Sequence, residues 1–180
     1  MTPPRMSRRR WLAVAAATVV GGGSLFAWRI RSGDHPHFTR LTEVRSWLDS
    51  LGDEPRLASS GAWSPGRVLS HCAQSIAYSV QGYPELKNGA FRATVGPLAA
   101  GVFGALGAMK HGLDEPIPGA AEVGEPTVAD AIGRLRAAMT AFDTAATLAP
   151  HFAYGELDRP AYDAAHAMHV SEHLSEIHRG

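Results

Sequence analysis

Apolar residues recur at intervals of three and four along four separate segments of the chain, and no run of residues alternates between apolar and polar. Intervals of three and four place apolar side chains on one face of an α-helix, whereas alternation is typical of a half-buried strand. A chain of 180 residues, 45% of them hydrophobic, can bury the continuous core of one domain. The sequence therefore predicts an all-α fold, a four-helix bundle with one long crossover.

Each predicted helix begins at a capping residue or a first-turn proline and ends near a glycine, a proline or the end of the chain. The predicted helices cover residues 39–52, 64–83, 127–149 and 160–180. The long crossover between the second and third helices carries apolar residues at helical spacing over residues 95–109, so we expect an accessory helix there. Gly101, Gly104 and Gly107 within that segment weaken a helix by about 1 kcal/mol each relative to alanine, and a partly irregular segment is the alternative.

Residues 1–33 carry the pattern of an export signal. Three arginines, Arg8 to Arg10, precede an uncharged segment at residues 11–28 that is rich in Ala, Val and Gly. Paired arginines before a moderately apolar segment resemble a twin-arginine signal, which passes folded proteins to the twin-arginine export machinery. An ordinary signal anchor is the alternative, in which residues 11–28 stay in the membrane uncleaved. In both cases we expect residues 34–180 to work outside the cytoplasm, in the periplasm or another extracytoplasmic space.

The charges of the chain are distributed unevenly, although its formal net charge is zero. Six of the 17 basic residues and none of the acidic residues precede Asp34, so the remainder has 11 basic and 17 acidic residues, a net charge of −6. A domain with this balance lacks the basic surface that phosphate backbones require, and we expect no nucleic-acid partner. The single cysteine, Cys72, excludes an internal disulfide, and we assign it to the core.

The last predicted helix contains the pattern that suggests chemistry. At 100° per residue, His166, His169 and His173 fall within one arc, and Val170 in the same arc marks it as the face that enters the core. A buried polar ring without a partner costs on the order of 1–3 kcal/mol, so three of them in a row indicate that something satisfies them. His169 and His173 are four residues apart, a spacing from which both rings can reach one metal ion. Core histidines bonded to carbonyls or water are the alternative.

The pair also belongs to the run His169-Val-Ser-Glu172-His173, which spells the H-x-x-E-H pattern of inverted zinc proteases. Those proteases take a third ligand far downstream, which this sequence does not provide, so we do not expect a protease. Glu172 and Glu176 are weak candidates for a catalytic base or for a carboxylate that orients a ligand ring. For each of them, a solvated carboxylate on an amphipathic helix is the alternative.

A third metal ligand has to come from another helix, and His71 is the best candidate. It shares a strip of the second predicted helix with Ser75 and Tyr78, with Gln74 at its edge, and this strip flanks the apolar stripe. A mixed face of this kind is expected of a pocket lining, and a histidine exposed at the rim is the alternative. We expect Gln74, Tyr78 and the histidines His151 and His166 to line the pocket or to support the ligands.

Several segments of the sequence also resemble a known protein family. They are Trp63–Pro84, Ile117–Gly119, His151–Leu157 and His166–Leu174. Together they resemble a domain-of-unknown-function family of the DinB-like (DinB/YfiT-like) superfamily, over about residues 38–178. The resemblance implies a DinB-like four-helix bundle over residues 34–180.

It also implies a divalent metal held by one histidine of the second helix and an H-x-x-x-H pair of the fourth, which here are His71, His169 and His173. Two positions depart from the family pattern: Tyr162 replaces a Trp and Phe152 replaces a Pro. Neither is a proposed ligand, so the metal assignment stands, and the departure at Tyr162 concerns the shape of the pocket.

Three neutral imidazoles suit zinc first, and nickel, iron or manganese next, and they leave a fourth coordination position open. An ion there could lower the pKa of bound water to about 7 or hold a thiolate or a carbonyl. Two hypotheses follow. One is a metal-dependent hydrolase or thiol-dependent transferase acting on a small molecule, alone or as a homodimer. The other is a noncatalytic metal- or ligand-binding envelope protein, which a closed coordination sphere would favour.

Overall fold

The computed structural model of the chain describes residues 35–53 and 55–180. The expected export signal at residues 1–33 and the expected anchor at residues 11–28 lie outside these residues. None of the helices in the two described ranges combines the length and the apolar composition that crossing a membrane requires.

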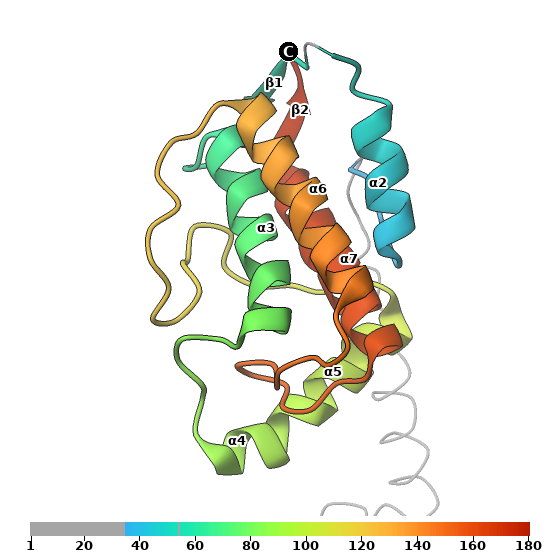
Figure 1. Cartoon of the computed structure of the whole chain (residues 1–180), viewed down its shortest axis with the longest axis vertical. Coiled ribbons are helices and arrows are strands. Elements are labelled where there is room, and N and C mark those ends of the chain that lie inside the picture. Colours follow the sequence, from blue (N-terminus) through green and yellow to red (C-terminus); the bar gives the residue numbers. More distant parts are fainter. Residues whose placement is uncertain (1–34, 54) are drawn as a thin grey trace, which may run out of the picture. The chain divides into compact units, whose positions relative to one another are not determined.

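The described chain is mainly α-helical, as predicted. Its longer helices run side by side in Figure 1, and two further helices lie on the crossover. The helices are α2 (Leu41–Asp49), α3 (Pro65–Gln81), α4 (Gly89–Ala93), α5 (Val95–Leu106), α6 (Val128–Thr144) and α7 (Arg159–His173). Helix α3 packs against α6 over most of its length, and α7 packs against α2, α3 and α5. The accessory helix predicted over residues 95–109 is present as α5.

Capping side chains fix where the long helices begin. Ser64 Oγ accepts a hydrogen bond from the backbone N–H of Arg67, and Pro65 occupies the first turn of α3. Thr127 caps α6 in the same way. These starts follow the sequence prediction because the caps satisfy backbone donors that a helix leaves free in its first turn. Helix α7 begins behind a cap that we did not predict, Asp158, whose carboxylate accepts from the N–H of Ala161.

The C-terminal end of the last helix differs from the prediction. Helix α7 stops at His173 and is followed by a 3₁₀ turn, η1 (Leu174–Glu176), and by the strand β2 (Ile177–Arg179). Strand β2 pairs antiparallel with β1 (Leu57–Ser59), with Ala58 opposite His178. The expectation of a purely helical domain was wrong at this point, because strands of three residues are too short to show alternation. Helices α3 and α6 also end earlier than predicted, at Gln81 and Thr144.

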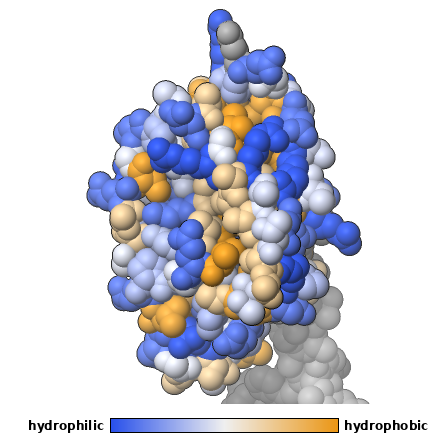
Figure 2. All heavy atoms as spheres, viewed as in Figure 1, coloured by the Kyte–Doolittle hydropathy of each residue, from blue (hydrophilic) through white to orange (hydrophobic). Residues whose placement is uncertain are grey.

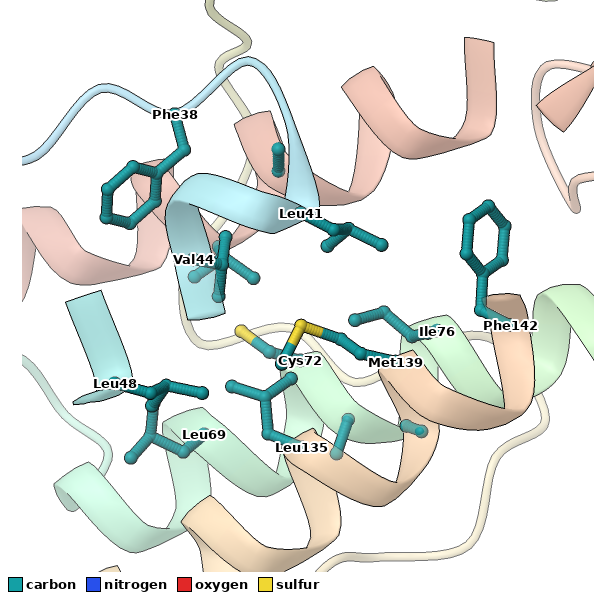
Figure 3. Close-up of a cluster of buried hydrophobic side chains, with 14 of the residues drawn as sticks. Phe38, Leu41, Val44, Leu48, Leu69, Cys72, Ile76, Leu135, Met139 and Phe142 are labelled. Carbon is teal, nitrogen blue, oxygen red and sulfur yellow. The ribbon is translucent and has the colours of Figure 1, made fainter. Parts of the chain in front are cut away.

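Apolar side chains from α2, α3, α6 and α7 form one buried cluster, part of which Figure 3 shows. The labelled members are Phe38, Leu41, Val44, Leu48, Leu69, Cys72, Ile76, Leu135, Met139 and Phe142. Cys72 lies inside this cluster, as predicted, and burial raises the pKa of its thiol to about 12. The thiol therefore stays protonated and packs as a small apolar group.

Helices α4 and α5 of the crossover lie at the end of the long helices that is opposite to β1 and β2, and α5 packs against α7 there (Figure 1). A second, smaller buried cluster joins Met109 to Ala165 and Met168 of α7. The connection from α5 to α6, residues 107–127, contains no helix or strand, but Met109 and Ile117 are both only 5% exposed. The first part of this connection is therefore held against the body of the fold at two points. On the face shown in Figure 2, apolar residues appear in small groups among hydrophilic ones.

Candidate metal centre

Three histidines from two helices converge inside the fold. His71 comes from α3, and His169 and His173 come from successive turns of α7. One ligand nitrogen of each lies within 4.8 Å of the others, and the Nε2 atoms of His169 and His173 are 3.1 Å apart. The structure thus brings together the three residues that the sequence predicted as metal ligands.

The surroundings of His71 explain why it is buried although its strip flanks the apolar stripe of α3. The indole of Trp63 meets the His71 ring edge-on at 5.1 Å and lies parallel to the His173 ring at 6.3 Å. His71 is only 3% exposed as a result. The alternative of an exposed histidine at the rim is therefore wrong. The guanidinium of Arg67 lies over the ring of this indole, 4.6 Å from its centre.

Burial keeps these imidazoles neutral. Burial, together with the nearby His111 and Arg67, which act in the same direction, lowers the pKa of His71 from 6.5 to about 4. It also lowers the pKa values of His169 and His173 well below 6.5, with neighbouring imidazoles adding to the effect. A neutral imidazole offers one nitrogen lone pair, the form in which histidine binds a metal. The three side chains are thus in the ligand form throughout the neutral pH range.

The donor set fits a divalent cation. Zn–N bonds of about 2.0 Å place two imidazole nitrogens on a tetrahedral ion roughly 3.3 Å apart, close to the separation of the His169 and His173 Nε2 atoms. Without an ion, one of these two nitrogens has to carry a proton and donate to the other. The second ring nitrogen of His173, Nδ1, is buried and has no hydrogen-bond partner in the described part of the chain. Imidazoles alone do not select among zinc, nickel, iron and manganese.

A fourth imidazole, His111, lies beside the three and was missed by the sequence analysis. Its ring centre is 4.9 Å from those of both His169 and His173. The residue lies in the connection after α5, where no helical periodicity indicates which way a side chain points. The sequence offered one hint, since His111 follows the predicted accessory helix by two residues.

A cavity of about 270 Å³ opens next to the three histidines. His71, His169 and His111 form part of its wall, and apolar side chains including Met109, Ile117 and Ala165 form much of the rest. This volume suits a small molecule or a part of a larger one. A ligand in the cavity would therefore touch the histidine cluster on one side and a mostly apolar wall with some polar side chains elsewhere.

Two further predicted pocket residues, His151 and His166, also line this cavity. His151 Nδ1 accepts hydrogen bonds from the N–H groups of Ala153 and Tyr154, both at 3.1 Å, so its proton is on Nε2. His166 is 2% exposed, and its Nε2 has no hydrogen-bond partner among the described residues. Burial lowers the pKa values of both histidines to about 3, so both rings are neutral.

The structure does not bring the remaining predicted pocket residues to the histidines. Gln74 donates a hydrogen bond to the carbonyl of Ala121, at 2.9 Å, and lines a separate groove between α3 and α6. The ring of Tyr78 packs against that of Tyr83, at 5.8 Å. Both side chains lie farther along α3 than His71. Gln74 contacts the connection before α6, and Tyr78 contacts the loop after α3.

Neither carboxylate candidate orients a ligand ring. Glu172 is 3% exposed, and its Oε1 lies 2.9 Å from the ammonium of Lys110. Glu176 belongs to the turn η1, and its carboxylate occupies the space that a side chain at position 61 would need. No hydrogen bond joins either carboxylate to His71, His169 or His173, all of which the structure describes. Glu172 instead anchors the residue that precedes His111.

Sequence comparison adds the family of the chain. The family described as a protein of unknown function (DUF1569) matches residues 32–179, which include every residue of the histidine cluster and of the cavity wall. The chain therefore belongs to the DUF1569 family. Comparison with curated proteins and with solved structures gave no significant match.

Proposed function

We propose that this DUF1569 protein is a metal-dependent enzyme that acts on a small molecule bound in the cavity beside the histidine cluster. The reaction class that we propose is hydrolysis or thiol-dependent group transfer. One observation carries the proposal: His71 and His169 belong both to the three-histidine group and to the cavity wall. A substrate in the cavity would thus lie next to the bound ion.

The histidines of α3 and α7 would hold the ion, and a bound ion would supply a Lewis acid that polarises a carbonyl or activates water or a thiol. The chain's own residues then have separate tasks. Met109, Ile117 and Ala165 give the cavity apolar walls against which the apolar part of a substrate would pack. His166 offers its unpartnered nitrogen as a hydrogen-bonding group to the substrate. We assign no catalytic base, because Glu172 pairs with Lys110.

The proposal includes a DinB-like four-helix bundle. It is supported by the packing of α2, α3, α6 and α7 around one apolar cluster and by the positions of the three histidines on α3 and α7. It also includes an exported protein, which rests on the arginine motif and the uncharged segment within residues 1–33. We favour zinc as the ion, because zinc commonly takes three histidines in catalytic sites.

A noncatalytic metal-binding protein is the second candidate, and the position of His111 favours it. An imidazole this close to the cluster could complete the coordination of the ion, and a structural site is closed whereas a catalytic site keeps one position open. His166, the other buried histidine of α7, lies outside the group of three ligand nitrogens.

Metal analysis of the full chain, purified without a histidine tag, tests the proposal. We expect close to one divalent ion per chain, and loss of that ion in His71→Ala, His169→Ala and His173→Ala. The matched control is His178→Ala, because His178 is an exposed histidine of β2. A parent protein that binds no metal, or triad variants that keep it, would contradict the proposal.

Binding of a small thiol to the cobalt-loaded protein distinguishes the two candidates. A thiol that reaches an exchangeable position changes the visible spectrum of the bound cobalt, as expected of an enzyme. A spectrum that stays the same at saturating thiol would favour the noncatalytic protein.

A further inference from the structure

A hydrogen bond selects one tautomer of the neutral His111 ring, and this tautomer leaves one nitrogen free to bind a metal. Its Nδ1 lies 2.7 Å from the carbonyl oxygen of Gly112, which can only accept a hydrogen bond, so Nδ1 carries the proton. The lone pair is therefore on Nε2. This atom is buried, and it has no hydrogen-bond partner in residues 35–53 and 55–180.

The ring of His111 is about as near to the rings of the two ligand histidines of α7 as the ring of His71 is. The ring centre of His71 lies 5.1 Å from that of His169 and 4.7 Å from that of His173. The corresponding distances from His111 are both 4.9 Å. His71 approaches the pair from α3, and His111 approaches it from the connection after α5. Two imidazoles from different parts of the chain thus pack against the same pair of rings.

The chain on both sides of His111 is held near the cluster. Met109 and Ile117 are buried, and the ammonium of Lys110 lies 2.9 Å from the carboxylate of Glu172 on α7. Between these anchors the backbone belongs to no helix or strand, and Gly112 is exposed. His111 lies outside the group whose ligand nitrogens are within 4.8 Å of one another, so a small shift of this segment is needed to bring Nε2 to the ion. An irregular surface segment accommodates such a shift more easily than a helix does.

We infer that His111 is a fourth ligand of the metal centre, binding through Nε2, and that it is the ligand that leaves when a substrate group reaches the ion. This inference rests on the proposed metal site. His111 is the exchangeable ligand because it is carried by the segment after α5, whereas the other three are fixed on helices. It also faces the cavity, so an incoming group reaches the ion on the side of His111.

A cysteine at position 111 gives the sharpest test. In cobalt-loaded His111→Cys, a thiolate bound directly to the ion adds an intense charge-transfer absorption in the near ultraviolet, which a cysteine that merely lies nearby does not give. We expect this absorption in His111→Cys and not in the matched control His178→Cys. Its absence in a His111→Cys protein that still binds one cobalt would overturn the inference.

Removing the imidazole tests the same ligand by affinity. Removal of a residue that only hydrogen-bonds to a metal ligand typically weakens metal binding 10–100-fold. Removal of a direct ligand should have at least as large an effect, so we expect His111→Ala to weaken metal binding by at least about 10-fold. X-ray absorption should count four imidazoles in the parent protein and three in His111→Ala. An unchanged affinity and an unchanged count would overturn the inference, while the proposed function would still stand if His71→Ala loses the ion.

Addition of a small thiol to the parent protein tests the exchange. We expect the imidazole count to fall from four to three as a sulfur ligand appears. A count that stays at four with no sulfur bound would show that His111 is a permanent ligand, which would overturn the exchange and favour a noncatalytic site.

Discussion

Helix α3 has an apolar face and a face that carries His71, and both are buried. Only the apolar face is stable without a bound ion. One face contributes Leu69, Cys72 and Ile76 to the apolar cluster with α2 and α6. The other presents His71 to α7 and to the segment after α5. Burial acts on both faces, since it raises the pKa of the Cys72 thiol to about 12 and lowers the pKa of the His71 imidazole to about 4. Each group is neutral at neutral pH, but only the imidazole is then in its metal-binding form, because a cysteine binds a metal as the thiolate.

This difference teaches that the two faces contribute to stability under different conditions. The apolar face stabilises the fold whether or not a metal is present, because burial of apolar area needs no partner ion. The imidazole face should stabilise it mainly when an ion is bound, because ligand binding to the native state adds to the free energy of unfolding. Variants on the two faces should therefore separate stability from metal binding.

The largest effect is expected in the apolar cluster. Leu135 of α6 is fully buried, and Leu135→Ala should lower the free energy of unfolding by about 2–5 kcal/mol through lost burial and a residual cavity. Urea unfolding measures this loss. Metal content measured well below the unfolding transition should be unchanged, and a loss of metal would mean that the two faces are not separate.

His173→Ala should show the opposite pattern. With the metal at about 100 times its dissociation constant, the parent protein should gain about 2.7 kcal/mol of stability, and the variant should gain none. Thermal unfolding with the metal and with a chelator measures both values. In chelator the variant should lose less stability than Leu135→Ala does, and a larger loss would show that His173 is needed for the fold itself.

Acid should destabilise the protein through its buried imidazoles. The folded-state pKa of His166 is about 3, below the unfolded value of 6.5, so the unfolded chain binds the proton first as the pH falls. Stability should be constant above pH 6.5 and should decrease between pH 6.5 and about 3, by up to about 1.4 kcal/mol per pH unit for each such imidazole.

His166→Leu isolates the contribution of one imidazole. It should reduce the slope of stability against pH in this window by up to about 1.4 kcal/mol per unit, measured by urea unfolding in the presence of a chelator. The exposed His178→Ala variant serves as control and should leave the slope as it is. Equal slopes for His166→Leu and the parent would mean that His166 is not held neutral.

The smallest effect on stability is expected from a surface ion pair that belongs to neither the apolar face nor the imidazole face of α3. Arg136 of α6 and Asp49 of α2 form an ion pair at 2.6 Å, with side chains that are 41% and 64% exposed. Solvent screens such a pair, so Arg136→Ala should change stability by no more than about 1 kcal/mol and should leave metal binding intact. A loss comparable to that of Leu135→Ala would contradict the view that the stability resides in the buried cluster.

The helices and the histidine pair of α7 could be predicted because their signals are local. Apolar periodicity and capping residues mark each helix, and a spacing of four residues places His169 and His173 on one side of α7 whatever the rest of the fold does. His71 could be selected as a ligand because it shares a mixed strip of α3 with polar neighbours. Its burial could not be predicted, because the burial depends on Trp63 and on the segment after α5.

Other features depend on tertiary packing and left no local signal. His111 lies in a segment without periodicity, and its place beside α7 is set by the anchors at Met109 and Ile117. Glu172 pairs with Lys110, a residue of the same segment, instead of bonding a ligand histidine. The pairing of β1 with β2 joins residues more than a hundred positions apart, and three-residue strands carry too little pattern to predict it.

The pairing of β1 with β2 contributes to the alignment of α3 with α7, the two helices that carry the ligand histidines. Strand β1 leads into α3 and β2 follows α7, with Leu57 opposite Arg179. The smallest slip that keeps each side chain on its own face is two residues, or about 6.6 Å along the strands. This exceeds the 4.8 Å within which the three ligand nitrogens lie. Three paired residues at the edge of the fold thus add to the direct packing of α3 against α7, which brings His71 to the histidines of α7.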